Sequence, residues 1–127
     1  MGKNEILLKL QLLSYGIMAI CNNIREIRKE YIITKKLLTN TVSMHYHYEK
    51  MLFTDDVDTF IKHLNKAVAK YPKILFYLRL LNFNELLSEE TMDARIKDIL
   101  EINSLINQFV GEFKEKIAEQ ERNSQNE

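Results

Sequence analysis

Residues 45–49, with the sequence His-Tyr-His-Tyr-Glu, concentrate imidazole, phenol and carboxylate groups in one short segment. On a helix, histidines two residues apart point about 200° away from each other, whereas helical metal ligands need a spacing of three or four residues. His45 and His47 therefore cannot chelate one ion together. His45 and Glu49 have a suitable spacing, and His63 is a candidate third ligand, but the pattern favours a packed aromatic patch over a metal site.

The same segment is a candidate interaction patch, formed by His45, Tyr46, His47 and Tyr48. In one interpretation, Tyr46 or Tyr48 buries its ring and leaves its hydroxyl in water. In another interpretation, Tyr46 and His47 lie on the surface, where they stack on an unpaired base or contact another subunit.

Four lysines recur at helical spacing between residues 62 and 73. Lys62, Lys66, Lys70 and Lys73 fall within an arc of roughly 80° on a helix of 3.6 residues per turn. Spaced cations on a rigid helix match a phosphate backbone and give salt-sensitive, sequence-independent affinity. The alternative is a solvated face whose lysines pair with an acidic fourth helix. The candidate nucleic-acid contacts are Arg25, Arg28, Lys35, Lys36, Lys62, Lys66, Lys70 and Lys73.

Catalytic motifs are missing from the sequence. It has no glycine-rich phosphate loop, no nucleophile with its flanking signature and no Glu-x-x-His pair of a di-iron bundle. Asp55, Asp56 and Asp58 are typical of a helix start and lack the glycine turn of a calcium loop. The sequence therefore predicts a protein that is not an enzyme, with no catalytic residue, cofactor or metal site.

Apolar residues recur with a seven-residue rhythm, which keeps one stripe of a helix facing its partners. In the first helix the stripe comprises Ile6, Leu10, Leu13, Ile17, Ile20, Ile24 and Ile27. In the third helix it comprises Val57, Ile61, Leu64, Val68, Tyr71, Leu75 and Leu78. Pro72 lies inside this third stripe and predicts a bend rather than a break, because the apolar rhythm continues on both sides.

The predicted fold is all-α, an antiparallel up-down-up-down four-helix bundle within residues 1–122. We expect helices at residues 3–29, 31–52, 55–82 and 88–121, followed by a polar tail at 123–127. Short connections between long helices force neighbours to run antiparallel. The second helix has the weakest helix propensity of the four, because residues 39–43 are poor helix formers in a row and depend on tertiary packing.

Charge is divided unevenly along a chain of zero net charge. Residues 1–82 carry 13 Lys and Arg against 7 Asp and Glu, whereas residues 83–127 carry 5 against 11. The acidic fourth helix either neutralises the first three or leaves them with an exposed basic face.

Cys21 is the only cysteine, so we expect a buried core residue that forms no disulfide, as is typical of proteins in a reducing compartment. Without a signal peptide or a bilayer-length apolar run, we expect a cytoplasmic protein with no membrane contact.

Several segments, in order, resemble a known family. They are Arg28-Lys29-Glu30-Tyr31 after a long first helix, Lys36-Leu37-Leu38 leading to Ser43, Phe60-Ile61 with Ala67, and Phe76-Tyr77-Leu78-Arg79-Leu80-Leu81 before an Ile- and Asn-rich last helix. This order resembles the four-helix bundle proteins of the 23S rRNA intervening-sequence family over about residues 6–117. In the segment 41–47 the chain departs from that family, since both of the family's glycines and its asparagine are replaced.

The resemblance implies a non-enzymatic homo-oligomer, commonly a homopentamer. It also implies a relation to accessory proteins of diversity-generating retroelements, and both groups point by analogy to nucleic acid. We therefore expect an oligomeric scaffold or binding module that contacts RNA or DNA through a basic face. The alternative is a protein-interaction module with no nucleic-acid role, which uses the 45–48 patch as its contact.

Overall fold

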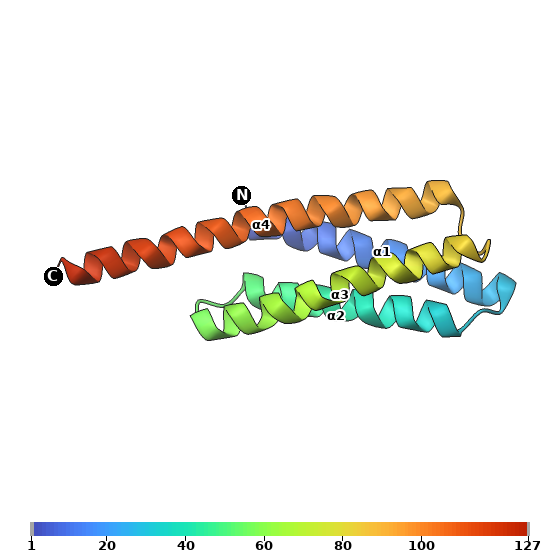
Figure 1. The fold of residues 1–127 in the computed structure, drawn as a ribbon, viewed down its shortest axis with the longest axis horizontal. Helices are drawn as coiled ribbons and strands as arrows, with labels where there is room; N and C mark the ends of the chain where they lie inside the picture. The colour runs from blue at the N-terminus through green and yellow to red at the C-terminus, as the bar shows by residue number, and fades with distance from the viewer. Residues whose placement is uncertain (1, 127) are drawn as a thin grey trace.

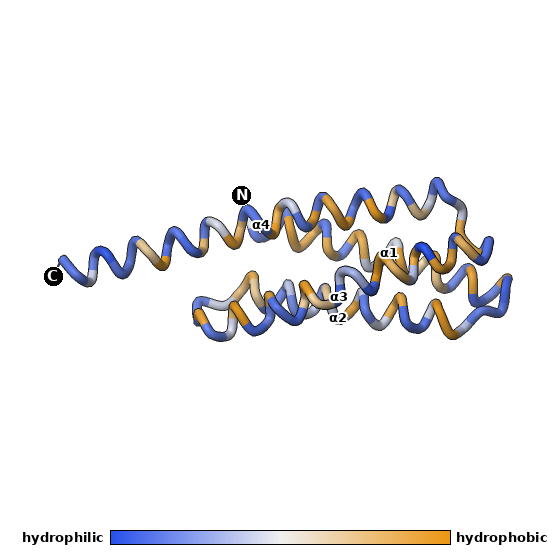
Figure 2. Tube along the Cα trace, viewed as in Figure 1, coloured by the Kyte–Doolittle hydropathy of each residue, from blue (hydrophilic) through white to orange (hydrophobic). Residues whose placement is uncertain are grey.

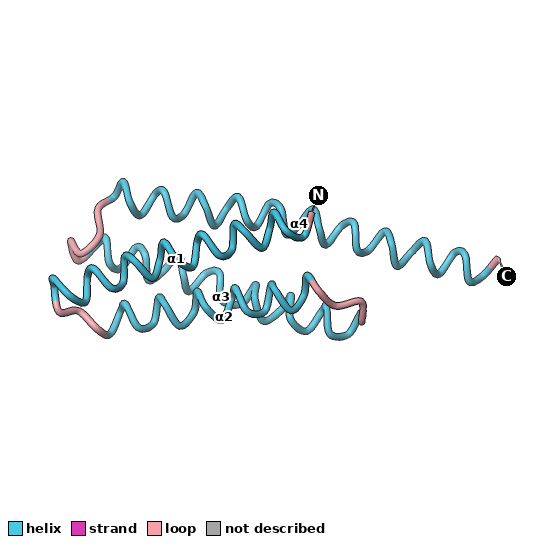
Figure 3. The backbone as a smooth tube through the Cα atoms, turned by 180° about the vertical axis from the view of Figure 1, so that it is seen from behind, coloured by secondary structure: helices cyan, strands magenta, loops and turns pink. Residues whose placement is uncertain are grey.

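Four α-helices make up almost all of the computed structural model, which describes residues 2–126. They are α1 (Lys3–Arg28), α2 (Ile32–Leu52), α3 (Val57–Phe83) and α4 (Glu89–Gln125), and no strand occurs among the described residues. Successive helices run antiparallel (Figure 1), as predicted for an up-down-up-down bundle. The connections α1–α2 and α3–α4 lie at one end and α2–α3 at the other (Figure 3). α2 and α3 pack most closely, whereas α3 and α4 meet only sparsely and α4 runs past the end of the bundle.

The core follows the predicted stripe over most of α1. Ile6, Leu10, Leu13 and Ile17 are at most 2% exposed, and apolar residues line the inner sides of the helices (Figure 2). Ile27, the last member of the predicted stripe, is 66% exposed because the helix ends one residue later. The seven-residue rhythm therefore predicts the buried face of α1 up to Ile24.

The predicted stripe of α3 is only partly in the core, where Leu78 is buried and Leu64, Tyr71 and Leu75 are half-buried. The buried face of α3 comprises Phe60, Ala67, Ile74, Leu78 and Leu81, whereas Val57, Ile61 and Val68 of the predicted stripe are 39–50% exposed. α3 carries apolar residues around more than half of its circumference, so its sequence offers two overlapping stripes. The buried stripe packs mainly against α2, although Phe60 also stacks on Phe113 of α4. Val57 and Ile61 of the other stripe line a surface pocket beside α4.

Polar side chains start the helices where the sequence predicted. The Asp56 carboxylate accepts a hydrogen bond from the Thr59 backbone N–H at 2.9 Å. Ser88 Oγ accepts from the Thr91 N–H at 3.1 Å. These caps satisfy N–H groups that the first helical turn leaves unpaired. The Glu30 carboxylate, which was not predicted to cap, accepts from backbone N–H groups at the start of α2.

α2 and α3 are both continuous across the positions that their sequences mark as weak. α2 is continuous through its weak segment, where buried Thr41 donates its hydroxyl to the Leu37 carbonyl at 2.8 Å. α3 continues through Pro72 without a break, as predicted. α4 reaches Gln125 and so includes most of the predicted tail at 123–127, of which residue 127 lies outside the described residues.

The outer face of α1 is unusually apolar. Residues 10–24 carry no charge, and Leu8, Leu12 and Tyr15 are 55%, 60% and 67% exposed. By length and composition alone, α1 could cross a membrane, but a core helix of a bundle meets the same criterion. Its opposite face packs in the bundle core, so α1 has one buried and one uncovered apolar side.

Candidate nucleic-acid interface

The four residues of the predicted interaction patch point in different directions. His45 turns toward α1, where its Nδ1 lies 2.8 Å from Ser14 Oγ. His47 turns toward α3, and Tyr48 is 1% exposed in the core. Tyr46 alone is well exposed, at 52%. The patch is therefore not one continuous surface, because a helix rotates each successive residue by about 100°.

His47 contacts His63, which the sequence analysis placed beside His45 and Glu49. Its Nδ1 lies 2.9 Å from His63 Nδ1, with the rings stacked at 5.1 Å between centroids. The Tyr46 ring contacts both imidazoles edge-on, and Lys50 Nζ lies 5.7 Å from the Tyr46 centroid. His63 thus joins His47 rather than the predicted pair of His45 and Glu49. Among the described residues, no three potential metal ligands come together.

Positive charge surrounds the two histidines. Burial lowers the pKa of His47, and nearby positive groups lower it further, namely His63, Lys66, Lys70 and Lys62. Burial likewise lowers the pKa of His63, followed by the charges of Lys62, Lys66 and Lys50. Both rings are therefore predominantly neutral near pH 7, in a setting that disfavours added cations.

The lysine row lies on the side of α3 that faces α2. Lys62, Lys66 and Lys73 are exposed and Lys70 is half-buried. Within residues 2–126, none of the four has a carboxylate within 4.0 Å. The inter-helix ion pair of α4 is Glu101 with Lys9 of α1, at 3.0 Å. The acidic helix therefore does not neutralise the row through direct ion pairs.

We call the surface formed by the lysine row and its neighbours on α2 the basic seam. Lys36 belongs to it, because eleven residues, about three turns, separate it from His47 on the same side of α2. Tyr46 at one end is an exposed aromatic ring, and Tyr77 follows Lys73 by one helical turn at the other. The basic seam comprises Lys36, Tyr46, His47, Lys50, Lys62, His63, Lys66, Lys70, Lys73 and Tyr77.

Three predicted nucleic-acid contacts lie outside the basic seam. Arg25 Nε donates to Thr34 Oγ1 at 2.9 Å, and Arg28 Nη1 donates to the Glu85 carbonyl at 3.2 Å. Both arginines thus tie the end of α1 to neighbouring segments. Lys35 is exposed but points about 100° away from Lys36.

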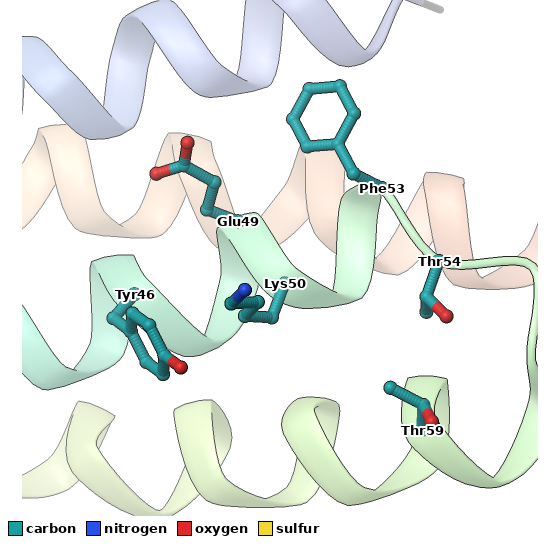
Figure 4. Close-up of a pocket in the computed structure, with 6 residues that line it drawn as sticks. All are labelled: Tyr46, Glu49, Lys50, Phe53, Thr54 and Thr59. Carbon is teal, nitrogen blue, oxygen red and sulfur yellow. The ribbon is translucent and has the colours of Figure 1, made fainter.

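A surface pocket of about 560 Å³ adjoins Tyr46 at the connection between α2 and α3 (Figure 4). In this view Tyr46 points toward α3, whereas Phe53 and Glu49 project to the opposite side of α2. The pocket combines aromatic, hydroxyl and charged groups and is open to solvent. Its lining consists of Tyr46, Glu49, Lys50, Phe53, Thr54 and Thr59.

A second polar chain links α1 to α2. Ser14 Oγ bonds His45 Nδ1, and His45 Nε2 lies 3.6 Å from a Glu49 carboxylate oxygen. Burial lowers the pKa of His45, whereas the charge of Glu49 raises it. Ser14 is 8% exposed in the middle of a helix, where its backbone N–H is already bonded and cannot stabilise an oxyanion. The chain is better suited to joining two helices than to nucleophilic catalysis.

Sequence reasoning missed Lys50 as a member of the basic seam, and Ser14 as the partner of His45. Lys50 had a usable signal, because it follows His47 by three residues and so shares its side of the helix. Ser14 had none, since 31 residues separate it from His45. Only the packing of α1 on α2 brings the two together.

Comparison with known proteins gives structural similarity alone. No protein-family model and no curated protein matches the sequence. The chain is similar to the crystal structure of a protein of unknown function from the S23 ribosomal protein family of Bacteroides thetaiotaomicron VPI-5482, with a TM-score of 0.78 and 21% identity. The match covers 84% of this chain and 99% of that one. The four-helix fold of this chain is thus shared with an S23-type bundle.

Proposed function

We propose that the protein is a non-enzymatic helical scaffold that binds single-stranded RNA or DNA along the basic seam. The observation that carries this proposal is the row of Lys62, Lys66, Lys70 and Lys73, with no carboxylate among the described residues close enough to form an ion pair. A solvated lysine row without local counter-charges attracts polyanions.

The dimensions of the row suit a nucleic-acid backbone. Lys62 and Lys73 are eleven residues apart, which corresponds to about 17 Å at 1.5 Å per residue. Successive lysines follow each other at intervals of roughly 4.5–6 Å along the helix. The exposed Tyr46 ring offers a platform for one unpaired base, and such stacking is tolerant of sequence. A single strand exposes its phosphate backbone and its unpaired bases at the same time, so it fits the seam better than a duplex.

The similar structure adds context to this proposal. Its family name, S23 ribosomal protein, is compatible with an RNA partner, although that protein has unknown function. We further propose that this chain is a divergent member of the 23S rRNA intervening-sequence family, related to retroelement accessory proteins. At 21% identity the shared fold is compatible with that assignment.

The test measures binding of a fluorescent single-stranded oligonucleotide by anisotropy at about pH 8, where the histidines are neutral. The variant changes Lys62, Lys66, Lys70 and Lys73 to Gln. A matched control removes the same number of positive charges from α4, at Lys97, Lys114, Lys116 and Arg122.

Neutralising four phosphates on a single strand gives a slope of about −2.8 in log affinity against log salt, so affinity falls about 50-fold between about 50 and 200 mM. We expect the seam variant to lose most of this slope and the α4 control to keep it. Equal losses in both variants would show that net charge, rather than the seam, controls binding.

The outer face of α1 supports a second candidate function, in protein association. Leu8, Leu12 and Tyr15 form an exposed apolar stripe in a stretch with little charge, and such patches mark interaction surfaces. We propose that copies of the chain associate through this stripe. Tyr48, which belonged to the predicted contact, is in the core and unavailable. Changing Leu12 and Tyr15 to Ser should reduce the mass measured by sedimentation, and an unchanged mass would refute this role.

A further inference from the structure

The geometry of the histidine pair restricts how many protons it can hold. His47 Nδ1 and His63 Nδ1 lie 2.9 Å apart, so one must donate an N–H and the other must accept it through a lone pair. Two protonated rings would each present an N–H to the other, and the hydrogen bond would be lost. The closed pair is thus compatible with at most one added proton.

We propose that His47 and His63 form a phosphate-binding site, in which both rings are protonated and donate to one phosphate group of a nucleic-acid backbone. This inference rests on the proposed function, because it assigns a ligand and a regulation to the end of the basic seam beside Tyr46. In the ligand-free state the two histidines are hydrogen-bonded to each other. When both rings are protonated neither can accept a hydrogen bond, and the phosphate oxygens become the acceptors.

The surroundings favour an anion over a cation. From α2, Lys50 and Tyr46 face the pair, and from α3 the nearby charges are Lys62, Lys66 and Lys70. Within the described residues, no carboxylate contributes to the shift of either pKa. Glu49, which neighbours this segment in sequence, lies beside His45 instead. An arriving phosphate would therefore be the first negative charge at a site with several positive ones.

Proton uptake follows from this arrangement. In the free protein, burial and the lysines hold the pKa of both rings below 6.5. A bound phosphate stabilises the protonated rings and raises both pKa values toward or above that figure. Affinity then increases as pH falls, and each unit of pKa rise in one ring corresponds to about tenfold tighter binding at low pH.

The two Nδ1 donors come from separate helices, His47 from α2 and His63 from α3, and both can reach one phosphate. Half-buried rings lose less donor strength to water than exposed ones, and N–H donors from a cation to phosphate are among the stronger hydrogen bonds. One phosphate carries several acceptor oxygens, so two Nδ1 atoms held a few ångströms apart can share it. The site would also join α2 to α3 near the end of the seam that contains Tyr46.

The experiment compares oligonucleotide affinity at about pH 5 and about pH 8, at constant ionic strength, by anisotropy and by calorimetry in two buffers that report proton uptake. The test variant is His47→Gln with His63→Gln, because glutamine keeps a hydrogen-bonding pair that does not titrate. The control is His45→Gln, a histidine on the same helix that faces Ser14. Circular dichroism at both pH values verifies that each variant is folded.

We expect the native protein to bind at least about tenfold tighter at the lower pH, with net proton uptake. The double variant should lose the pH dependence of binding, whereas the control should retain it. If the double variant keeps the native pH dependence, the histidine site is refuted while seam binding stands. If no variant or native protein binds at either pH, the proposed function fails as well.

A second arm separates free phosphate from backbone phosphate. Imidazole proton resonances are titrated alone, with inorganic phosphate and with the oligonucleotide. A rise in the pKa of His47 and His63 with either ligand supports the site, and a rise with the oligonucleotide alone identifies backbone phosphate as its ligand. If neither inorganic phosphate nor the oligonucleotide changes the pKa of His47 or His63, the proposal is overturned, even if the oligonucleotide binds elsewhere.

Discussion

Leu12 and Leu13 are adjacent leucines in opposite environments, and they allow a controlled test of the bundle core. Leu13 is 2% exposed, whereas Leu12 is 60% exposed on the outer face of α1. Leu13→Ala removes three buried carbons, worth about 2.4 kcal/mol at about 0.8 kcal/mol each, and leaves a cavity that raises the cost to about 3 kcal/mol. Leu12→Ala should change the free energy of unfolding by less than about 0.5 kcal/mol.

The assay is urea unfolding followed by circular dichroism, at one fixed protein concentration because self-association would add to stability. For a chain of this length, a loss of about 3 kcal/mol corresponds to a Tm lower by roughly 10–15 °C. Equal destabilisation by the two substitutions, or a larger effect at Leu12, would refute the assignment of the buried face. If Leu12→Ala lowers the oligomeric mass but keeps the helical circular dichroism signal, the result would instead support association through α1.

Three further predictions test the capping, stacking and burial described above. Asp56→Ala should lower the free energy of unfolding by about 1 kcal/mol, measured in urea, because it removes the bond to the Thr59 N–H, whereas Asp55→Ala should have little effect. Tyr46→Ala should weaken oligonucleotide binding about 5- to 150-fold by anisotropy, the equivalent of about 1–3 kcal/mol for one stacked base, and an unchanged affinity would remove Tyr46 from the interface. Burial raises the pKa of the Cys21 thiol to about 11, so a thiol reagent at about pH 8 should react with native protein far more slowly than with unfolded protein, and equal rates would contradict its burial.

The architecture was predictable because few turns and a persistent apolar rhythm leave few folds open. The rhythm of α1 places Ile6, Leu10 and Leu13 in the core, as predicted. In α3 the same method chose the stripe of Val57 and Ile61, although Phe60 and its neighbours on the next face are buried. A periodic pattern specifies that a helix has an apolar side, but α3 has enough apolar residues for two, and only the partner helices decide between them.

The lysine row illustrates a different limit. Its internal spacing was sufficient to place Lys62, Lys66 and Lys73 on one side of α3, since that depends only on 3.6 residues per turn. Whether the acidic α4 neutralises the row depends on which side of α3 faces which neighbour. The row lies toward α2, and the Glu101 carboxylate of α4 pairs with Lys9 of α1 instead. Opposite net charges along a sequence therefore do not imply contact between the segments that carry them.

The histidine string combines both kinds of information. Its helical spacing was enough to exclude joint chelation by His45 and His47, and the structure places one toward α1 and the other toward α3. The partners, Ser14 and His63, depend on how far each antiparallel neighbour slides along α2, and that offset is set by the whole core rather than by the string. Helical spacing therefore determines which side of α2 His47 occupies, and the packing of α3 on α2 determines which residue it contacts. A shift of α3 by one turn would separate His63 from His47 while leaving every helix intact.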